Sequence, residues 1–444
     1  MPSRGTSESR QRWQSGLPPT FGGAWICPST GEPLELVLSG ENGCSVLSTP
    51  GRSSRCWPVV DGVPFLRSDR TETADRVVDA IASGQSDSAR SLLFTEPRDL
   101  EALPNELCDS GSVRARLRLV TRFVRRVEAA AADRTPRTFD QAEPSEADEL
   151  FDEASRTFGF ERRRLHAVRW TGATTYGLSA RALLTLHPPV AGVVLHSGCS
   201  FGGLLSHLRR HKLDAVGTDP DWTSLWIARH LLGCEVPLAC IGRDQTRIPV
   251  QLDSIVPVTH VVGPAASVVP FDPAIASAQA EAVGPKGRLI VASVPYDGLP
   301  PAAWQPARAS VDVYDRDELV RQASEFRKPD SLNRAAVDEF GSDHCFSYTV
   351  TPQLASRTPK WELMLPPDGT RLRINPLYRQ WRTHHDQSDP DCQCHDCDSL
   401  SHVADLLHWR DDEVDRELLE PGWTAADVDV IELLRTYVLV PATV

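Results

Sequence analysis

A glycine-containing loop and an acidic residue about twenty positions later form the pattern with the clearest chemical meaning in the sequence. Gly198 and Gly202 follow the apolar run 193–195 and precede a segment with helical spacing. Glycines in such a strand-to-helix turn leave backbone N–H groups open to a ligand at the start of the helix. Asp219 ends the next apolar run, where a carboxylate can accept hydrogen bonds from both hydroxyls of a ribose. The pattern therefore predicts a site for a ribose-containing ligand.

The segment 165–380 resembles the class I S-adenosylmethionine-dependent methyltransferases. The residues around Gly198 and Gly202 match the family's first motif, V-L-D-x-G-C-G-x-G, and Asp219 matches its ribose-binding acid. The resemblance implies a doubly wound, mostly parallel, Rossmann-like α/β sheet. It also implies S-adenosylmethionine as the cofactor and an unidentified acceptor substrate for the methyl group. The cofactor-binding residues that it implies are Gly198, Ser200, Gly202, Asp219 and, beside the adenine, Asp244.

Three departures from the family pattern bear on catalysis. His196 stands where the family has an acid at the end of its first strand, and Ser200 stands where the motif has its middle glycine. The stretch 263–270, which holds catalytic polar residues in many relatives, contains no Asp, Asn, His or Tyr. Methyl transfer depends mainly on proximity and alignment, so the lack of an obvious base does not exclude it. The sequence names no catalytic residue, and a catalytically degenerate binding or scaffold protein with a protein partner remains the alternative.

A nicotinamide-dependent dehydrogenase is a further alternative for a sheet of this type. A dinucleotide pyrophosphate is bound by a loop with the spacing G-x-G-x-x-G. Residues 198–203 are Gly-Cys-Ser-Phe-Gly-Gly and do not have that spacing. The sequence therefore favours the methyltransferase over the dehydrogenase.

The odd number of cysteines, 11, is concentrated at the two ends of the chain. The residues around Cys27, Cys44 and Cys56 resemble the small zinc-ribbon domain of the tRNA-methyltransferase activator family, whose ending commonly has the form YPI-x-DGIP-x-L. A zinc ribbon normally supplies two C-x-x-C knuckles. Cys27 is followed by Ser29 and Thr30, so we expect a ribbon fold that has lost its zinc.

The C-terminal cluster has a spacing closer to that of a metal site. Cys394 and Cys397 form a C-x-x-C pair, and Cys392 with a histidine such as His395 could complete a tetrahedral Zn²⁺ shell. A flexible polar loop with chance cysteines is the alternative. The methyltransferase resemblance does not reach this segment, so it gives these residues no purpose.

Five segments follow from the changes in composition and periodicity along the chain. Short apolar runs alternate with helix-length segments between residues 190 and 295, which predicts parallel strands covered by helices. Residues 361–365 are expected to form a further strand near the end of this sheet. The expected segments are a disordered leader (1–24), a β-rich ribbon domain (25–68), a helical connector (69–164), the methyltransferase-like domain (165–380), and a Cys/His-rich segment with an acidic helical tail (381–444).

The overall charge restricts the class of partner. The 444 residues include 47 Lys and Arg against 60 Asp and Glu, which gives a formal net charge of −13. Bulk electrostatics therefore do not indicate binding to nucleic acid. The first residues lack the apolar core of a signal peptide, and no run approaches the length of a membrane span. We expect a soluble, cytoplasmic protein with no membrane partner.

Overall fold

The computed structural model describes the two sheet-forming parts of the chain and short pieces of the C-terminal segment. Residues 97–164 of the expected helical connector lie outside the described residues. The described residues are 15–17, 23–40, 43–51, 55–96, 175–189, 193–232, 236–242, 250–252, 258–262, 288–295, 309–332, 345–352, 358–370, 372–375, 378, 381–382, 404, 407, 433–435 and 439–441.

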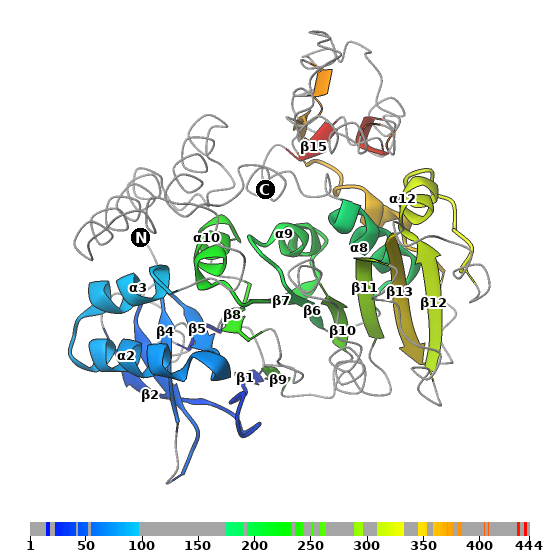
Figure 1. Cartoon of the computed structure of the whole chain (residues 1–444). Coiled ribbons are helices and arrows are strands. Elements are labelled where there is room, and N and C mark those ends of the chain that lie inside the picture. The colour runs from blue at the N-terminus through cyan, green and yellow to red at the C-terminus, as the bar shows by residue number, and fades with distance from the viewer. Residues whose placement is uncertain are drawn as a thin grey trace.

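Five parallel strands form the centre of the molecule (Figure 1). They are β6 (Val193–Ser197), β7 (Asp214–Asp219), β8 (Leu238–Ile241), β10 (Val258–Val262) and β11 (Arg288–Pro295). In space their order is β8-β7-β6-β10-β11, and every neighbouring pair is parallel. The chain therefore moves outward from β6 to β8 and then returns to the other side of β6. In open α/β sheets, ligands bind at the carboxyl ends of the strands at such a reversal.

An antiparallel pair closes one end of this sheet. The strand β13 (Cys345–Pro352) lies between β11 and β12 (Ala309–Asp315) and is antiparallel to both. The mixed sheet of seven strands agrees with the doubly wound, mostly parallel α/β fold that the sequence predicts.

The prediction of a strand at residues 361–365 is wrong. Trp361–Met364 forms a short 3₁₀ helix, η7. The consecutive residues Leu363 and Met364 are both buried, so the segment does not alternate between two faces as a strand does. The Leu363 carbonyl of η7 accepts a hydrogen bond from a histidine side chain, His207 Nε2, at 2.8 Å.

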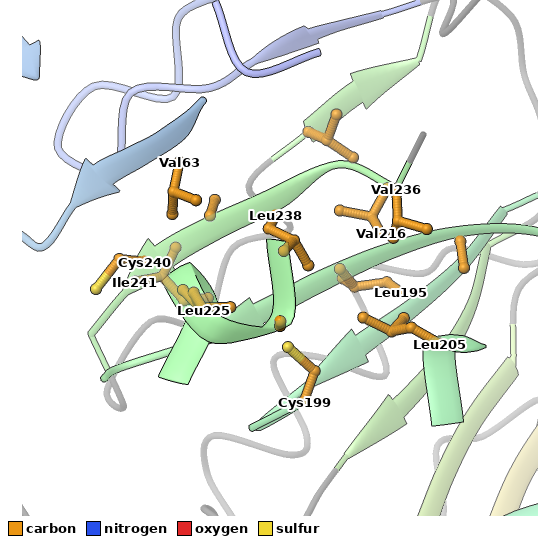
Figure 2. Packing of buried hydrophobic residues seen from close by; sticks show 14 of the residues in the cluster. Val63, Leu195, Cys199, Leu205, Val216, Leu225, Val236, Leu238, Cys240 and Ile241 are labelled. Atoms are coloured by element: carbon orange, nitrogen blue, oxygen red, sulfur yellow. The ribbon is translucent and has the colours of Figure 1, made fainter. Parts of the chain in front are cut away.

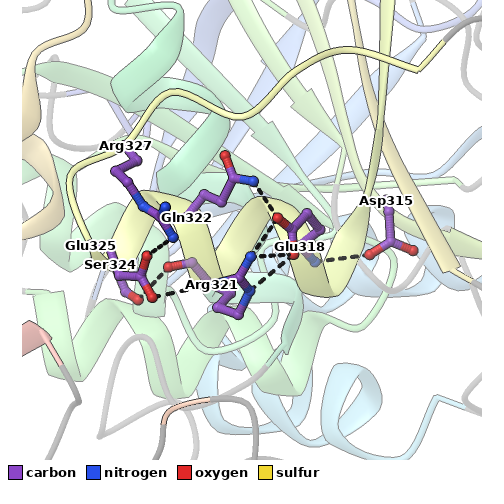
Figure 3. Close-up of polar contacts among 7 residues, drawn as sticks. All are labelled: Asp315, Glu318, Arg321, Gln322, Ser324, Glu325 and Arg327. Atoms are coloured by element: carbon purple, nitrogen blue, oxygen red, sulfur yellow. Dashed lines mark hydrogen bonds and ion pairs between the residues drawn. The ribbon is translucent and has the colours of Figure 1, made fainter.

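Four helices lie in a row along the sheet in Figure 1: α10 (Trp222–Leu232), α9 (Gly203–Arg210), α8 (Thr175–Leu186) and α12 (Arg316–Ser324). α10 packs on β8, α9 on β7 and α8 on β11. Asp315 caps α12 by accepting a hydrogen bond from the Glu318 N–H at 2.8 Å, and Figure 3 shows the ion pairs along the helix. These surface pairs stabilise the helix only slightly.

The N-terminal strands continue the same sheet at its other end. β2 (Glu35–Ser39), β3 (Ser45–Ser48), β4 (Cys56–Val60) and β5 (Val63–Leu66) form an antiparallel meander. β5 then pairs with β8 in the parallel sense, which joins Leu66 to Ile241 in register. The result is a sheet of eleven strands in the order β12-β13-β11-β10-β6-β7-β8-β5-β4-β3-β2.

Further contacts attach the N-terminal part to the rest of the chain. β1 (Gly23–Trp25) pairs with β9 (Val250–Leu252) in a separate two-stranded sheet. The helices α2 (Thr71–Ala82) and α3 (Ser86–Phe94) cover the meander, and the Phe94 ring lies 5.1 Å and 5.2 Å from the rings of Trp222 and Trp226. Both tryptophans are buried and pack in the core.

One hydrophobic core runs beneath both parts of the chain. Figure 2 shows Val63 of β5 in one cluster with Leu238, Cys240 and Ile241 of β8 and with Leu225 of α10. The N-terminal meander and the central strands therefore share one sheet and one hydrophobic core.

The C-terminal segment is described in short pieces. β14 (Leu372–Ile374) pairs with β15 (Leu439–Pro441), and Leu434 packs with them. Within the described residues, no helix has both the length and the apolar character to cross a membrane.

Candidate functional site

The glycine loop connects β6 to α9 through three left-handed residues. Gly198, Ser200 and Gly202 have φ angles of 70°, 48° and 85°. The Cys199 N–H donates to the Thr218 carbonyl at 2.9 Å, which fixes the loop beside the end of β7. Glycine adopts left-handed angles freely, whereas any other L-residue is strained there by roughly 1–2 kcal/mol. Ser200 thus has a left-handed backbone conformation, which a glycine at this position would adopt without strain.

The Asp219 carboxylate lies at the end of β7 and joins two loops. Its Oδ2 accepts a hydrogen bond from the Ser200 N–H at 2.8 Å, and its Oδ1 accepts one from the Asp221 N–H at 2.9 Å. A carboxylate can accept about four hydrogen bonds, so these two backbone donors do not by themselves exclude ribose hydroxyls. Asp219 is 4% exposed, so a ribose reaches it only if neighbouring groups move.

The turn after Asp219 also starts α10. Asp221 accepts hydrogen bonds from the Thr223 N–H at 3.1 Å and from the Ser224 hydroxyl at 2.6 Å. An aspartate in this place satisfies backbone donors that the first helical turn leaves without partners. The position of the Asp219 carboxylate is therefore tied to the beginning of a buried helix.

The structure brings together most of the predicted cofactor residues. Gly198, Ser200 and Gly202 share one loop, and the Ser200 amide contacts Asp219 from the next strand. Both loops follow parallel strands at the edge where the strand order reverses. Asp244 lies outside the described residues.

A tyrosine that sequence reasoning missed contacts the histidine at the end of β6. Tyr176 in α8 lies with its hydroxyl 2.8 Å from His196 Nε2, and the two rings stack with centroids 6.1 Å apart. Burial raises the pKa of the Tyr176 hydroxyl, so it stays protonated at neutral pH. Nothing in the sequence near residue 176 indicates this contact, because it joins a helix to a strand end across the fold.

The two cysteines near the loop are packing residues in this arrangement. Burial, with the Asp219 charge as a second cause, raises the pKa of the Cys199 thiol well above its usual value. Burial likewise raises the pKa of Cys240. A protonated thiol is a weak nucleophile, so neither side chain is suited to covalent catalysis.

The N-terminal cysteines are free thiols. Cys27 and Cys44 are buried and Cys56 is partly buried. Burial raises the pKa of Cys27, but hydrogen bonds from Thr30, Ser29 and Trp57 lower it more. Within the part of the chain that the structure describes, no three His, Cys, Asp or Glu side chains gather as a metal site requires. The resemblance of 25–68 to a zinc ribbon stays a prediction.

The loop that lacks a candidate base and the tail with its predicted zinc ligands are not part of the described site. Residues 263–270 lie outside the described ranges, as does the C-terminal cluster. The four predicted zinc ligands in that cluster are Cys392, Cys394, His395 and Cys397.

Comparison with known proteins finds similarity only among solved structures. No protein-family model matches the chain, and none of the curated proteins matches it. A TehB-like S-adenosylmethionine-dependent methyltransferase from Corynebacterium glutamicum is 14% identical, with a TM-score of 0.30, over 48% of this chain and 100% of that one.

Two further similar structures are also methyltransferases. The plantazolicin methyltransferase BpumL, solved with S-adenosylhomocysteine, is 11% identical over 53% of this chain and 97% of its own, with a TM-score of 0.28. The sugar N-methyltransferase KedS8 from Streptoalloteichus is 17% identical over 35% of this chain and 61% of its own, with a TM-score of 0.25. Values this low support no conclusion about the activity of this chain, so its function has to be inferred from its own geometry.

Proposed function

We propose that the chain binds S-adenosylmethionine at the carboxyl ends of β6 and β7 and transfers its methyl group to an acceptor. The observation that carries this proposal is the hydrogen bond between the Ser200 N–H and Asp219 Oδ2. It joins a left-handed glycine loop at a helix start to an acid at the end of the neighbouring parallel strand. This combination suits a ligand with a ribose and an amino-acid end.

The residues present fit the cofactor in two respects. Gly198 and Gly202 have the left-handed angles that let backbone and ligand approach closely, and α9 begins directly after them. Asp219 supplies a carboxylate at the strand end where a ribose is bound. In this assignment the loop holds the methionine part, Asp219 the ribose, and Asp244 the region of the adenine.

The bound cofactor would supply an electrophilic methyl group on a sulfonium. The chain's own contribution is to hold that group in line with an acceptor atom, because proximity and alignment account for most of the acceleration in such a displacement. Tyr176 contacts His196 at 2.8 Å, and its hydroxyl is protonated at neutral pH and is therefore not a base in its resting form. We therefore assign no residue as the catalytic base.

The topology supports a methyltransferase over a nicotinamide dehydrogenase. The dinucleotide-binding sheet has six parallel strands. Here β13 runs antiparallel to both β11 and β12, so the sheet departs from that all-parallel arrangement. The loop 198–203 also lacks the dinucleotide spacing.

Two observations favour a second candidate, a binding or scaffold protein that retains the fold without catalysis. Asp219 is nearly buried, and both of its oxygens accept backbone hydrogen bonds. Ser200 adds a hydroxymethyl group to a loop whose backbone would otherwise be open to the ligand. Both features work against entry of a cofactor.

Calorimetric titration distinguishes these candidates. We expect the full chain to bind S-adenosylmethionine and S-adenosylhomocysteine, and Asp219→Ala to abolish binding. Asp214→Ala is the matched control, because Asp214 is exposed at the opposite end of the same strand. If the folded wild-type chain gives no heat with either ligand at millimolar concentration, the methyltransferase proposal is overturned and the scaffold candidate stands.

A further inference from the structure

A buried arginine of the N-terminal part reaches the turn that carries the site carboxylate. Arg67 follows β5 directly and is 2% exposed. Its guanidinium pairs with both oxygens of Asp69, with Nε donating to Oδ1 at 3.1 Å, and its Nη1 donates to the Pro220 carbonyl at 3.0 Å. Pro220 is the residue between Asp219 and Asp221, so this last bond falls in the middle of the candidate ribose-binding turn.

The sheet register explains how residues so distant in sequence meet. β5 is parallel to β8, and β8 is parallel to β7. Phe65 and Asp219 are both in register with Cys240, so the ends of β5 and β7 lie at the same edge. The Cys240 thiol also donates to the Pro220 carbonyl, at 3.3 Å. The Pro220 carbonyl oxygen thus accepts hydrogen bonds from Cys240 in β8 and from Arg67, which follows β5.

The chemistry of this contact requires an arginine. A buried cation is tolerated only where hydrogen bonds and an opposite charge compensate for its desolvation. The planar guanidinium can pair with two carboxylate oxygens and still direct an N–H at a third acceptor. A lysine ammonium cannot reproduce this fork.

We propose that Arg67 is a positioning residue of the cofactor site. By holding the Pro220 carbonyl, Arg67 fixes the peptide groups on either side of it. These groups orient the Asp219 carboxylate toward the Ser200 amide and toward a bound ribose. The N-terminal part is thereby a component of the site and not only a neighbour of it. The role toward ribose rests on the proposed function.

Other contacts attach the N-terminal part to α10 without Arg67. Asp61 accepts hydrogen bonds from Trp226 Nε1 at 2.7 Å and from the Arg90 guanidinium at 2.7 Å and 2.8 Å. Arg229 Nη2 donates to the Gly62 carbonyl at 2.7 Å. Arg90 therefore offers a matched control, since it also forms a bidentate pair with an aspartate, in this case Asp61 between β4 and β5.

The test compares Arg67→Lys and Arg67→Met with Arg90→Lys in the full chain. Hydrogen exchange of peptides covering 198–204 and 219–223 is measured without ligand, and affinity for S-adenosylhomocysteine is measured by calorimetry. We expect both Arg67 variants to exchange faster in these two segments and to bind about tenfold more weakly. We expect Arg90→Lys to match the wild type in both measurements.

The hydrogen-exchange result tests the role of Arg67 at the turn independently of whether the chain binds the cofactor. If the Arg67 variants keep wild-type exchange and affinity, or if Arg90→Lys shows the same losses, Arg67 has no specific role at the turn and the inference is overturned. If the wild type binds no cofactor, the proposed function fails. In that case faster exchange confined to the Arg67 variants still supports positioning of the turn, and unchanged exchange overturns it.

Discussion

The Ser200 amide and the Asp219 carboxylate are joined by a hydrogen bond of 2.8 Å. This contact connects the loop after β6 to the end of β7, and the same carboxylate holds the Asp221 amide at 2.9 Å. A single side chain therefore organises the backbone on both sides of the candidate cofactor site. Its two roles, in structure and in ligand binding, lead to the first prediction.

Asp219→Asn should lose both stability and cofactor affinity. An amide retains one acceptor oxygen, but its NH₂ group faces one of the two backbone donors and leaves that donor without a partner. Leaving a buried donor unsatisfied costs about 1–3 kcal/mol of unfolding free energy. Urea denaturation measures this loss, and Asp214→Asn at the exposed end of the strand serves as the control. Equal stability of the Asp219 variant and the wild type would contradict the structural role of the carboxylate.

Gly217→Ala should destabilise the strand beneath the loop. A Cβ atom at this position would lie 2.4 Å from Leu205 Cδ1, 2.7 Å from Leu238 Cδ2 and 2.9 Å from Cys199 Sγ. Overpacking of this kind costs roughly 1–3 kcal/mol. Because the closest contact is with Leu205, the double variant with Leu205→Ala should be more stable than the sum of the single effects. Additive effects in a double-mutant cycle would show that the clash is relieved elsewhere.

The stability should fall as the pH drops from about 6.5 toward 4. Burial first, and then the nearby Arg181 charge, lowers the pKa of His207 well below 6.5, and burial lowers that of His211 to about 4. Below pH 6.5 these two histidines bind protons in the unfolded chain but stay neutral in the native state. Each group therefore removes up to about 1.4 kcal/mol of unfolding free energy per pH unit in that window.

The hydrogen bonds of the histidines specify the protonation state behind this prediction. His207 Nε2 lies 2.8 Å from the Leu363 carbonyl and must donate, so Nδ1 accepts from Arg181 Nη2 at 2.7 Å and the ring is neutral. His211→Gln removes one titrating group and can still donate to the Leu365 carbonyl, which His211 Nε2 contacts at 2.9 Å. Denaturation at several pH values should give this variant a shallower slope. An identical slope for variant and wild type would exclude His211 as a contributor.

Zinc analysis of the purified full chain tests the predicted tail site. If the tail binds zinc through Cys392, Cys394, His395 and Cys397, the purified chain should contain up to one zinc ion per molecule. Cys394→Ser should lower that zinc content. Cys56→Ser is the control, because Cys56 is a free thiol of the N-terminal meander. If Cys56→Ser lowers the zinc content and Cys394→Ser does not, the zinc site lies in the ribbon-like segment and not in the tail.

The sequence by itself predicted most of the strands and helices of the central sheet. It also predicted which strand ends carry the candidate site residues. Apolar runs of strand length, the glycine spacing and the acid at residue 219 predicted β6, α9 and β7, and they placed the candidate site at the strand ends. Strand β12 was not predicted, and residues 361–365 were assigned to a strand. At 361–365 a tertiary hydrogen bond, that of His207 to the Leu363 carbonyl, accompanies a local conformation that the sequence pattern did not predict.

Only the tertiary structure decided which distant groups share the site. The contact of Arg67 with Pro220 spans 153 residues and depends on β5 pairing with β8, while Tyr176 meets His196 through the packing of α8. Strand pairing and helix packing between remote segments are set by the burial of whole apolar faces, and no local spacing of residues encodes them. The sequence thus indicated a candidate cofactor site, and the fold brought Arg67 to the turn at Pro220 and Tyr176 to His196 near the end of β6.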